Sequence, residues 1–364
     1  MIIGFFVESI VYRYQSNRSA VINTMEDQFI VKRGKRWYDF YVKGVNLQNN
    51  EPSNAAISKA DYKKWFKEIA ALNANVIRIY TVLSPNFYKA FFEYNLLTDK
   101  PLYLLHGIRS HSAGRNTNAY DDRLNAVFLE EIRQTIDVVH GKASSRQSAQ
   151  TSGSYNLNIA PFVIGYILGE KMDANFVIAT DEKNAHVFGF EGDYLYTVNA
   201  SPCESWLAAM GNYVISYEHE KYGGPYKLIS WVNYPATAPI EDRNDQNQSG
   251  TVSVDFEHIR PTEKFNAGIF ASYNIYPNYP AGNYGSSNRQ YESNPYAEYL
   301  RTLKNHHKMP VIDAEFNGNT ADGTAVQMLD SIFNTGFNGG ILFAWQDEWL
   351  DKSNSIVREK FAEY

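Results

Sequence analysis

The chain has 364 residues, 44% of them hydrophobic, and a formal net charge of −6 at pH 7. This length accommodates one large domain or two ordinary ones, and the negative charge argues against a basic surface for nucleic acid. The single cysteine, Cys203, excludes an internal disulfide. No run approaches the ~18 consecutive apolar residues that a membrane span requires.

Aromatic residues are the least ordinary part of the composition, at 15% of the chain with 27 Tyr, 21 Phe and 6 Trp. Aromatic rings stack well on the C–H faces of sugars, so the excess fits a carbohydrate-binding surface. The simpler interpretation is that tyrosines cover the rim of a large domain. Composition alone favours the simpler interpretation.

The opening segment, MIIGFFVESIVYRY, has neither a basic leader nor a small-residue cleavage site. We therefore predict no signal peptide. The compartment stays open at this stage: cytoplasmic, unless the chain is a trimmed part of a secreted or multidomain protein.

In chain order, residues 1–38 form an N-terminal extension that contains a predicted hairpin. Residues 29–32 and 37–41 are apolar, and they flank a turn that has Gly34 at its centre. We expect the hairpin to close the bottom of the domain and to carry no chemistry.

Eight short apolar runs follow, and most are separated by segments with the helical spacing of apolar residues. The runs are residues 40–47, 75–80, 101–108, 161–169, 226–234, 267–274, 309–316 and 341–345. The helical segments are residues 60–72, 86–94, 121–139, 204–222, 295–306, 324–333 and 356–364. The helix after the fifth run is poorly marked.

This alternation predicts an α/β fold, a (β/α)8 TIM barrel in which residues 1–364 form one domain. Residues 142–158 are rich in Ser, Gln and Asn and read as a loop. Residues 171–201 form a long excursion after the fourth strand. Long loops of this kind on the C-terminal face of a barrel shape the substrate cleft.

Two of the predicted strands end on a carboxylate, Glu170 on the fourth and Glu315 on the seventh. Because successive side chains alternate in a strand, Glu315 should share a face with Asp313, and Glu170 with Tyr166. Barrel enzymes carry their chemistry at these strand ends. We therefore expect two carboxylates that point into the barrel mouth.

The same alternation brings further groups toward the mouth. Arg78 lies on the face of Val76, and a cation inside an apolar strand needs a carboxylate partner. A structural ion pair at the strand end is an equally good interpretation of Arg78. We also expect Tyr273 to point inward with Ala271, and Trp345 to lie beside the seventh strand.

Two facing carboxyl groups are what most glycoside hydrolases require. In retaining enzymes they stand ~5–5.5 Å apart, one as nucleophile and the other as acid and then base. The acid is kept protonated by burial and by the neighbouring negative charge, whereas the nucleophile must stay ionised.

Seven segments in this order resemble the clan of retaining (β/α)8 glycoside hydrolases whose acid/base and nucleophile glutamates end strands four and seven. The resemblance covers about residues 38–350. The segments are VKGVNL, NVIRIYTVLSPNFY, LYLLHGI, VIGYILGE, ASYNIYP, MPVIDAEF and GILFAWQDEW.

The resemblance implies that Glu170 is the acid/base and Glu315 the nucleophile. It implies that Arg78 and Tyr273 hold the nucleophile and that Trp345 is the floor of the sugar subsite. The expected activity is the hydrolysis of a β-linked oligo- or polysaccharide through a covalent glycosyl-enzyme.

We also predict substrate contacts from four residues at or near strand ends, namely His106, Tyr276, Asn46 and Asn233. A lone histidine such as His106 is more often a hydrogen-bonded spacer than a catalytic group.

One position departs from the clan. Most members have Asn before the acid/base, where it binds the sugar 2-hydroxyl, and this chain has Gly169. The departure favours an alternative function, a non-catalytic or weakly active carbohydrate-binding barrel. An unrelated barrel enzyme is a third possibility.

We expect no metal and no cofactor. The eight histidines are scattered, the pair His306–His307 falls on a predicted helix, and no phosphate-binding loop of the Walker type is present. The expected partner is a carbohydrate. The sugar, its linkage and the oligomeric state stay open.

Overall fold

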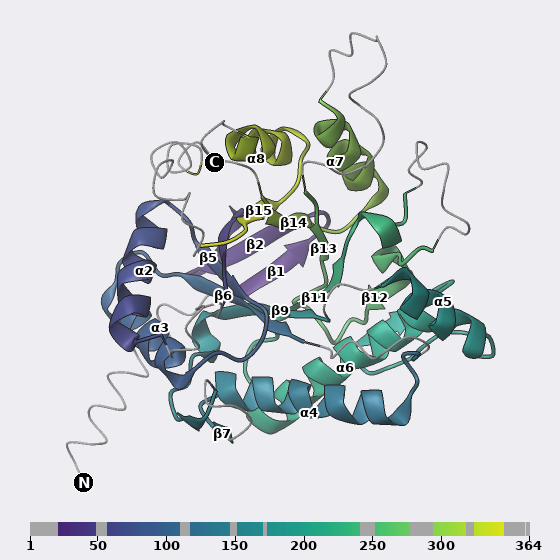
Figure 1. The fold of residues 1–364 in the computed structure, drawn as a ribbon, viewed down its shortest axis with the longest axis horizontal. Coiled ribbons are helices and arrows are strands. Elements are labelled where there is room, and N and C mark those ends of the chain that lie inside the picture. Colours follow the sequence, from purple (N-terminus) through teal and green to yellow (C-terminus); the bar gives the residue numbers. More distant parts are fainter. Residues whose placement is uncertain are drawn as a thin grey trace.

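Eight parallel strands close into a barrel at the centre of the molecule (Figure 1). The computed structural model describes residues 21–48, 57–109, 117–145, 151–169, 173–240, 252–276, 294–317, 324–345 and 361. Around the barrel the strands are β4 (Val42–Leu47), β5 (Val76–Ile79), β6 (Tyr103–Ile108), β9 (Val163–Leu168), β11 (Leu228–Asn233), β13 (Ala271–Asn274), β14 (Val311–Phe316) and β15 (Gly339–Leu342). Each strand pairs with the next in chain order, and β15 closes on β4. The predicted TIM-barrel class is confirmed.

Helices surround the barrel and follow its strands (Figure 1). They are α2 (Lys59–Ala71), α3 (Pro85–Leu97), α4 (Asp122–Val139), α5 (Ala174–Lys183), α6 (Pro202–Tyr222), α7 (Pro295–His306) and α8 (Thr324–Asn334). The weak helical signal after β11 has a structural counterpart. In the described part of that connection the chain forms 3-10 turns at Pro235–Thr237 and Phe256–His258 and a short strand, β12 (Ile259–Pro261). Among the described helices, none combines the length and the apolar character that crossing a bilayer requires.

Polar side chains define where the long helices begin. The hydroxyl of Ser201 accepts from the N–H of Glu204, and the Glu204 carboxylate accepts from the N–H of Ser201. This capping box satisfies two main-chain donors that the first turn of α6 leaves unpaired. Asp121 does the same for α4 by accepting from the N–H groups of Arg123 and Leu124.

Two apolar layers lie on the two sides of the barrel wall. One fills the barrel interior, and the other joins the outer face of the strands to the helices. The interior layer takes Val76 of β5, Leu105 of β6, Ile312 and Ala314 of β14, and Ile341 of β15. Membership of these layers shows which way each strand residue points, and that direction decides which polar groups reach the mouth.

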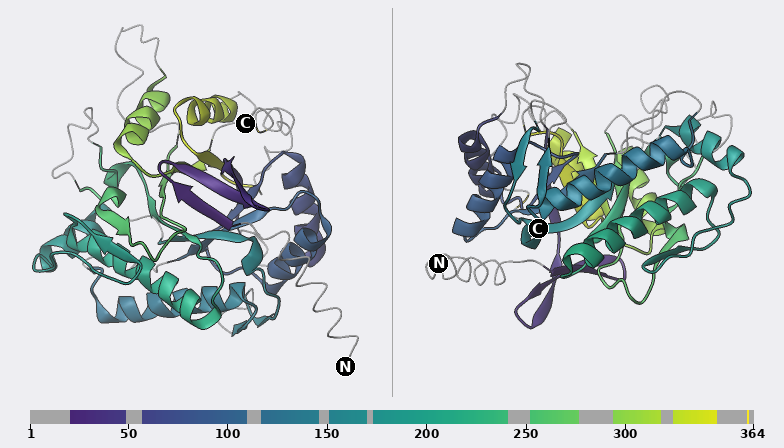
Figure 2. Two further views of the ribbon diagram at one scale, coloured as in Figure 1. Left: turned by 180° about the vertical axis from the view of Figure 1, so that it is seen from behind. Right: turned by 90° about the horizontal axis from the view of Figure 1, so that it is seen from below.

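A three-stranded antiparallel sheet closes the N-terminal end of the barrel, and Figure 2 shows its hairpin below the barrel. Its strands are β1 (Val21–Met25), β2 (Gln28–Arg33) and β3 (Arg36–Phe40). Its side chains Ile22, Phe29, Val31 and Phe40 belong to the interior layer, and the ring of Phe29 lies 5.3 Å from that of Phe270. The predicted hairpin and its role as a plug are therefore present, with β1 as an additional strand.

Residues 142–158 were expected to be a loop, and the structure corrects this. β7 (Ala143–Ser145) pairs antiparallel with β8 (Gly153–Tyr155). The excursion after β9 also contains regular structure, because β10 (Leu195–Thr197) pairs antiparallel with β12. Both pairings are too short and too polar to leave an alternating apolar pattern in the sequence.

Aromatic packing between α2 and α3 generates a test of the outer layer. Phe66 is fully buried, and its ring lies within 6.2 Å of the rings of Tyr62, Phe87, Phe91 and Tyr94. We expect Phe66→Ala to lower the free energy of unfolding by about 3–5 kcal/mol, because it leaves a cavity. Urea denaturation measures the change.

The matched control for that substitution is Phe188→Ala, since Phe188 is 92% exposed. We expect it to change the free energy of unfolding by no more than about 0.5 kcal/mol. Equal losses in the two variants would contradict the assignment of Phe66 to the core.

Candidate active site

Glu315 lies at the C-terminal end of β14 and points to a cation from another strand. Its Oε1 is 3.2 Å from Nη1 of Arg78, and its Oε2 accepts a 2.5 Å hydrogen bond from the hydroxyl of Tyr276. Arg78 is 1% exposed and Glu315 is 6% exposed. The pair is therefore nearly shielded from water, although Tyr276 is 39% exposed and reaches the surface.

Arg78 is held by several groups at once. Nη1 also donates to the main-chain oxygen of Ala314 at 2.8 Å, and Oδ1 of Asn274 lies 3.5 Å away. The guanidinium carbon lies 4.6 Å from the ring centre of Tyr80, a favourable cation–π distance. We expected either a carboxylate partner in the barrel mouth or a structural ion pair at the strand end. The pair of Arg78 with Glu315 is both, because it joins two strands and lies at the mouth.

An irregularity in β14 directs Glu315. We expected Asp313 and Glu315 to share one face, but the pairing of β14 with β15 shifts register between Asp313 and Phe316. Asp313 accepts from the hydroxyl of Tyr296 on α7 at 2.6 Å, on the helix side of the wall. A bulge that re-aims a side chain at a strand end is a frequent device beside active sites.

Tyr273 does not hold Glu315, contrary to our expectation. Phe270 belongs to the interior layer, so alternation turns Tyr273 outward, where it is fully buried in the layer beneath the helices. Its hydroxyl lies 2.8 Å from Nε2 of His307. The group that contacts Glu315 is Tyr276, in the loop that follows β13.

His106 and Asn233 also point away from the mouth, which corrects their predicted role as substrate contacts. Nε2 of His106 lies 2.8 Å from the hydroxyl of Tyr88 on α3. Asn233 accepts from Thr237 Oγ1 at 2.6 Å and donates to the oxygen of Val254 at 3.0 Å. Both side chains are fully buried, and both serve the barrel wall and its connections.

Asn46 and Trp345 lie beside the Arg78–Glu315 pair. Asn46 is the register partner of Arg78, and its Nδ2 donates to the oxygen of Ala314 at 3.1 Å. The N–H of Trp345 donates to the oxygen of Asn46 at 3.0 Å, and the indole is half-buried. Asn46 is fully buried, so it supports the floor of the mouth from below.

Glu170, the predicted acid/base, lies outside the described residues. The residue before it, Gly169, has a φ of +88°, and its N–H donates to the oxygen of Ile108 at 2.8 Å. An L side chain rarely adopts this backbone conformation. The positive φ at this position therefore accounts for glycine in place of the clan's usual Asn.

Asp313 lies two residues before Glu315 on β14, and we predicted no function for it from the sequence. Its Oδ1 accepts from the N–H of Glu315 at 3.2 Å and from the N–H of Ile275 at 3.3 Å. The carboxylate thereby fixes the main chain of the strand end that carries Glu315. The spacing of the two acids in VIDAEF was the available signal.

Asp313 makes a pH-dependent contribution to stability. Burial raises the pKa of its carboxyl from 3.8 to about 8, and the negative charge of Glu315 acts in the same direction. The folded state thus binds the proton more tightly than the unfolded state does. The contribution is fully present below about pH 4 and is lost as the pH rises through about 8.

We expect Asp313→Asn to remove this dependence. The free energy of unfolding of wild type relative to the variant should fall between about pH 5 and about pH 8, as measured by urea denaturation. Asp39→Asn, at an exposed site of β3, is the matched surface control and should change the free energy of unfolding by no more than about 0.5 kcal/mol. A difference between wild type and Asp313→Asn that stays constant with pH would refute the raised pKa.

Protein-family models give no match to the chain, and neither do curated protein sequences. Solved structures match its fold. Gas2 of Saccharomyces cerevisiae in complex with laminaritriose and laminaritetraose superposes with a TM-score of 0.56 at 14% identity, over 95% of this chain and 69% of that chain. The endo-1,4-β-mannanase from Rhizomucor miehei gives 0.56 at 11% identity, over 94% of this chain and 100% of that chain. The resemblance to (β/α)8 glycoside hydrolases is thus confirmed at the level of the fold.

Proposed function

We propose that the chain is a retaining glycoside hydrolase that acts on a β-linked oligo- or polysaccharide, with Glu315 as nucleophile and Glu170 as acid/base. The observation that carries the proposal is the pair of groups on Glu315. A carboxylate at the C-terminal end of a barrel strand receives one contact from Arg78 and one from Tyr276. Tyr276 is 39% exposed, so this contact lies at the surface of the mouth, unlike the buried tyrosine–carboxylate pairs of the barrel wall.

These contacts suit a nucleophile. Arg78 places a positive charge beside one oxygen of Glu315, and the Tyr276 hydroxyl donates to the other oxygen. Burial raises the pKa of Tyr276 well above its usual range, so the phenol keeps the proton that it donates. In the first step Glu315 attacks the anomeric carbon while Glu170 protonates the leaving oxygen, and in the second step Glu170 activates water.

Two buried polar atoms beside this site support a functional role. Within the described part of the chain, Oδ1 of Asn46 and Nε of Arg78 have no hydrogen-bond partner. Buried polar atoms in proteins are nearly always paired, so each exception needs an explanation, and a role in catalysis or binding is one of them. Both atoms belong to neighbouring strands at the level of the ion pair.

A second candidate is a barrel that binds carbohydrate without cleaving it. It is favoured by Gly169, which lacks the amide that most of the clan uses on the 2-hydroxyl. The two candidates separate in one experiment. Hydrolysis of aryl β-glycosides or polysaccharides by wild type, abolished in Glu315→Gln, supports the enzyme, whereas calorimetric binding without turnover supports the binder.

The two glutamates have different duties, which azide distinguishes. Glu315→Ala should lose turnover, and azide should restore it only by attack from the opposite face, giving a glycosyl azide of inverted configuration. Glu170→Ala should keep activity on substrates with good leaving groups, and azide should give the retained configuration. NMR of the azide products decides, and identical behaviour of the two variants would show that the roles are misassigned.

Two tyrosines provide a matched pair for the contact to the nucleophile. Tyr276→Phe removes a hydrogen bond to a charged group, worth ~1.5–3 kcal/mol, so kcat/KM should fall by about 10- to 100-fold. Tyr273→Phe should leave kcat/KM unchanged, because its hydroxyl contacts His307 on the other side of the wall. Steady-state kinetics on one aryl glycoside measures both, and equal losses would contradict the assignment.

A further inference from the structure

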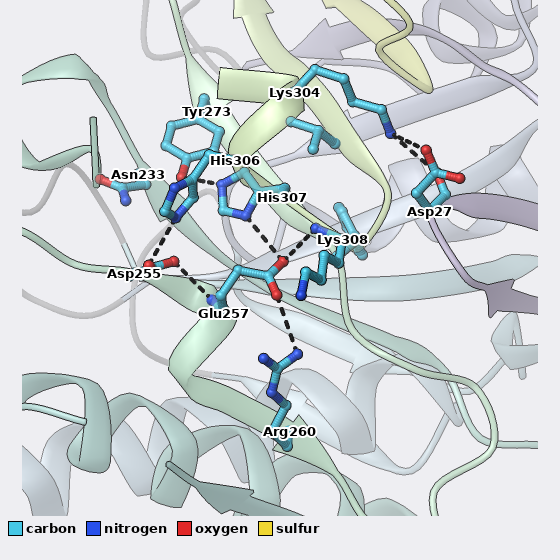
Figure 3. A network of polar contacts seen from close by, with 12 residues as sticks. Asp27, Asn233, Asp255, Glu257, Arg260, Tyr273, Lys304, His306, His307 and Lys308 are labelled. Atoms are coloured by element: carbon cyan, nitrogen blue, oxygen red, sulfur yellow. Dashed lines mark hydrogen bonds and ion pairs between the residues drawn. The ribbon is translucent and has the colours of Figure 1, made fainter. Parts of the chain in front are cut away.

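A cluster of potential metal ligands lies on the outer side of the barrel wall, away from the mouth. Asp255, His306 and His307 each offer one ligand atom, and these atoms all lie within 4.8 Å of one another. Figure 3 shows the three side chains converging from the connection after β11 and from the end of α7. About fifty residues separate Asp255 from the two histidines.

The side chains of the cluster already lie close together. Nε2 of His306 lies 2.8 Å from Oδ2 of Asp255. The rings of His306 and His307 are nearly perpendicular, at 88°, with centroids 5.1 Å apart. Two imidazoles and one carboxylate are ligands that Zn²⁺ prefers.

The carboxylate of Glu257 contacts the second ring nitrogen of His307. Nδ1 of His307 lies 3.4 Å from Oε1 of Glu257, which leaves Nε2, 2.8 Å from the hydroxyl of Tyr273, as the nitrogen that could bind a metal. Glu257 is itself fixed by the N–H of Lys308 at 2.8 Å and by Nη1 of Arg260 at 3.1 Å. A carboxylate on the second nitrogen orients a ligating histidine and raises its basicity.

Asp255 is also held in place by hydrogen bonds. Its N–H donates to Oε1 of Glu204 at 2.6 Å, and its Oδ1 accepts from the N–H of Glu257 at 2.9 Å. Asp255 is 8% exposed and His307 is 4% exposed, whereas His306 is half-buried. One edge of the cluster is thus open to an ion and to water, and the other is built into the core.

We propose that Asp255, His306 and His307 form a site for a divalent transition metal, with Zn²⁺ as the best-fitting ion. The ligand atoms are Oδ2 of Asp255 and Nε2 of both histidines, and water takes the fourth position at the open edge of His306. His307 gives up its hydrogen bond to Tyr273 when the metal binds. The sequence led us to expect no metal, because the ligands are remote in the chain and the histidine pair falls at the end of a helix.

The site ties the connection after β11 to the junction between α7 and β14. Its role is structural, since Glu315 lies at the opposite end of β14 and on the other side of the barrel wall. The proposal therefore does not depend on the proposed glycoside hydrolase activity, and no substrate enters its test.

The test is a titration of the full-length, chelator-stripped protein with ZnCl2 in competition with a chromophoric chelator. We expect one tightly bound equivalent for wild type. His306→Ala should weaken binding by at least about 100-fold, and Glu257→Gln, which removes only the carboxylate behind His307, by about 10- to 100-fold. Circular dichroism verifies that each variant is folded.

Two controls match these substitutions in residue type. His186→Ala and Glu263→Gln lie at exposed sites outside the cluster, and both should bind Zn²⁺ as wild type does. His306 is half-buried, so its variant carries the test even where His307→Ala fails to fold. The proposal is overturned if wild type binds no stoichiometric Zn²⁺, or if His306→Ala binds it with wild-type affinity.

Discussion

The ion pair between Arg78 and Glu315 is the constraint on which the barrel mouth depends. Both side chains are almost entirely removed from water, and removing one partner of such a pair costs about 3–5 kcal/mol because the other charge is left uncompensated. The pair joins β5 to β14, which are not neighbours in the barrel. The main-chain oxygen of Ala314 and the ring of Tyr80 add to the hold on the cation. The ion pair and its neighbours therefore hold the C-terminal ends of β5 and β14 in place, above the apolar layer of the barrel interior.

The elements of this barrel were predictable because their signals are long and periodic. Six described helices begin and end within a few residues of the segments with helical spacing, and α7 matches residues 295–306. α5 was not predicted, since it lies in the excursion of residues 171–201. The predicted helix at residues 356–364 lies outside the described residues, apart from residue 361. The direction of single side chains was harder to predict. Strands of a parallel barrel are apolar on both faces, so alternation groups residues into two sets without saying which set points inward.

Three strands illustrate this limit. Leu105, Val232 and Phe270 belong to the interior layer, and that parity sends His106, Asn233 and Tyr273 outward. Val76 also lies inside, and the same rule correctly placed Arg78. A sequence pattern of period two also cannot reveal the register shift in β14 that separates Asp313 from Glu315.

The outward-facing polar residues explain part of the unusual tyrosine content. Four buried hydroxyls span the layer between strands and helices and pair with an imidazole or a carboxylate. The pairs are Tyr88–His106, Tyr166–Glu218, Tyr273–His307 and Tyr296–Asp313. A phenol suits this layer because its ring fills apolar space while its hydroxyl satisfies one buried polar group.

A tyrosine hydroxyl that donates to a carboxylate thus occurs both at the mouth and in the wall, but in different surroundings. In the wall, these four hydroxyls are buried together with their partners. At the mouth, Tyr276 is 39% exposed whereas the Glu315 carboxylate that it contacts is 6% exposed, so the tyrosine is the member of this pair that solvent reaches. Buried polar networks stabilise a fold only when every member is satisfied. The same tyrosine–carboxylate contact therefore joins strand to helix where it is enclosed in the wall, and borders solvent where it lies at the mouth.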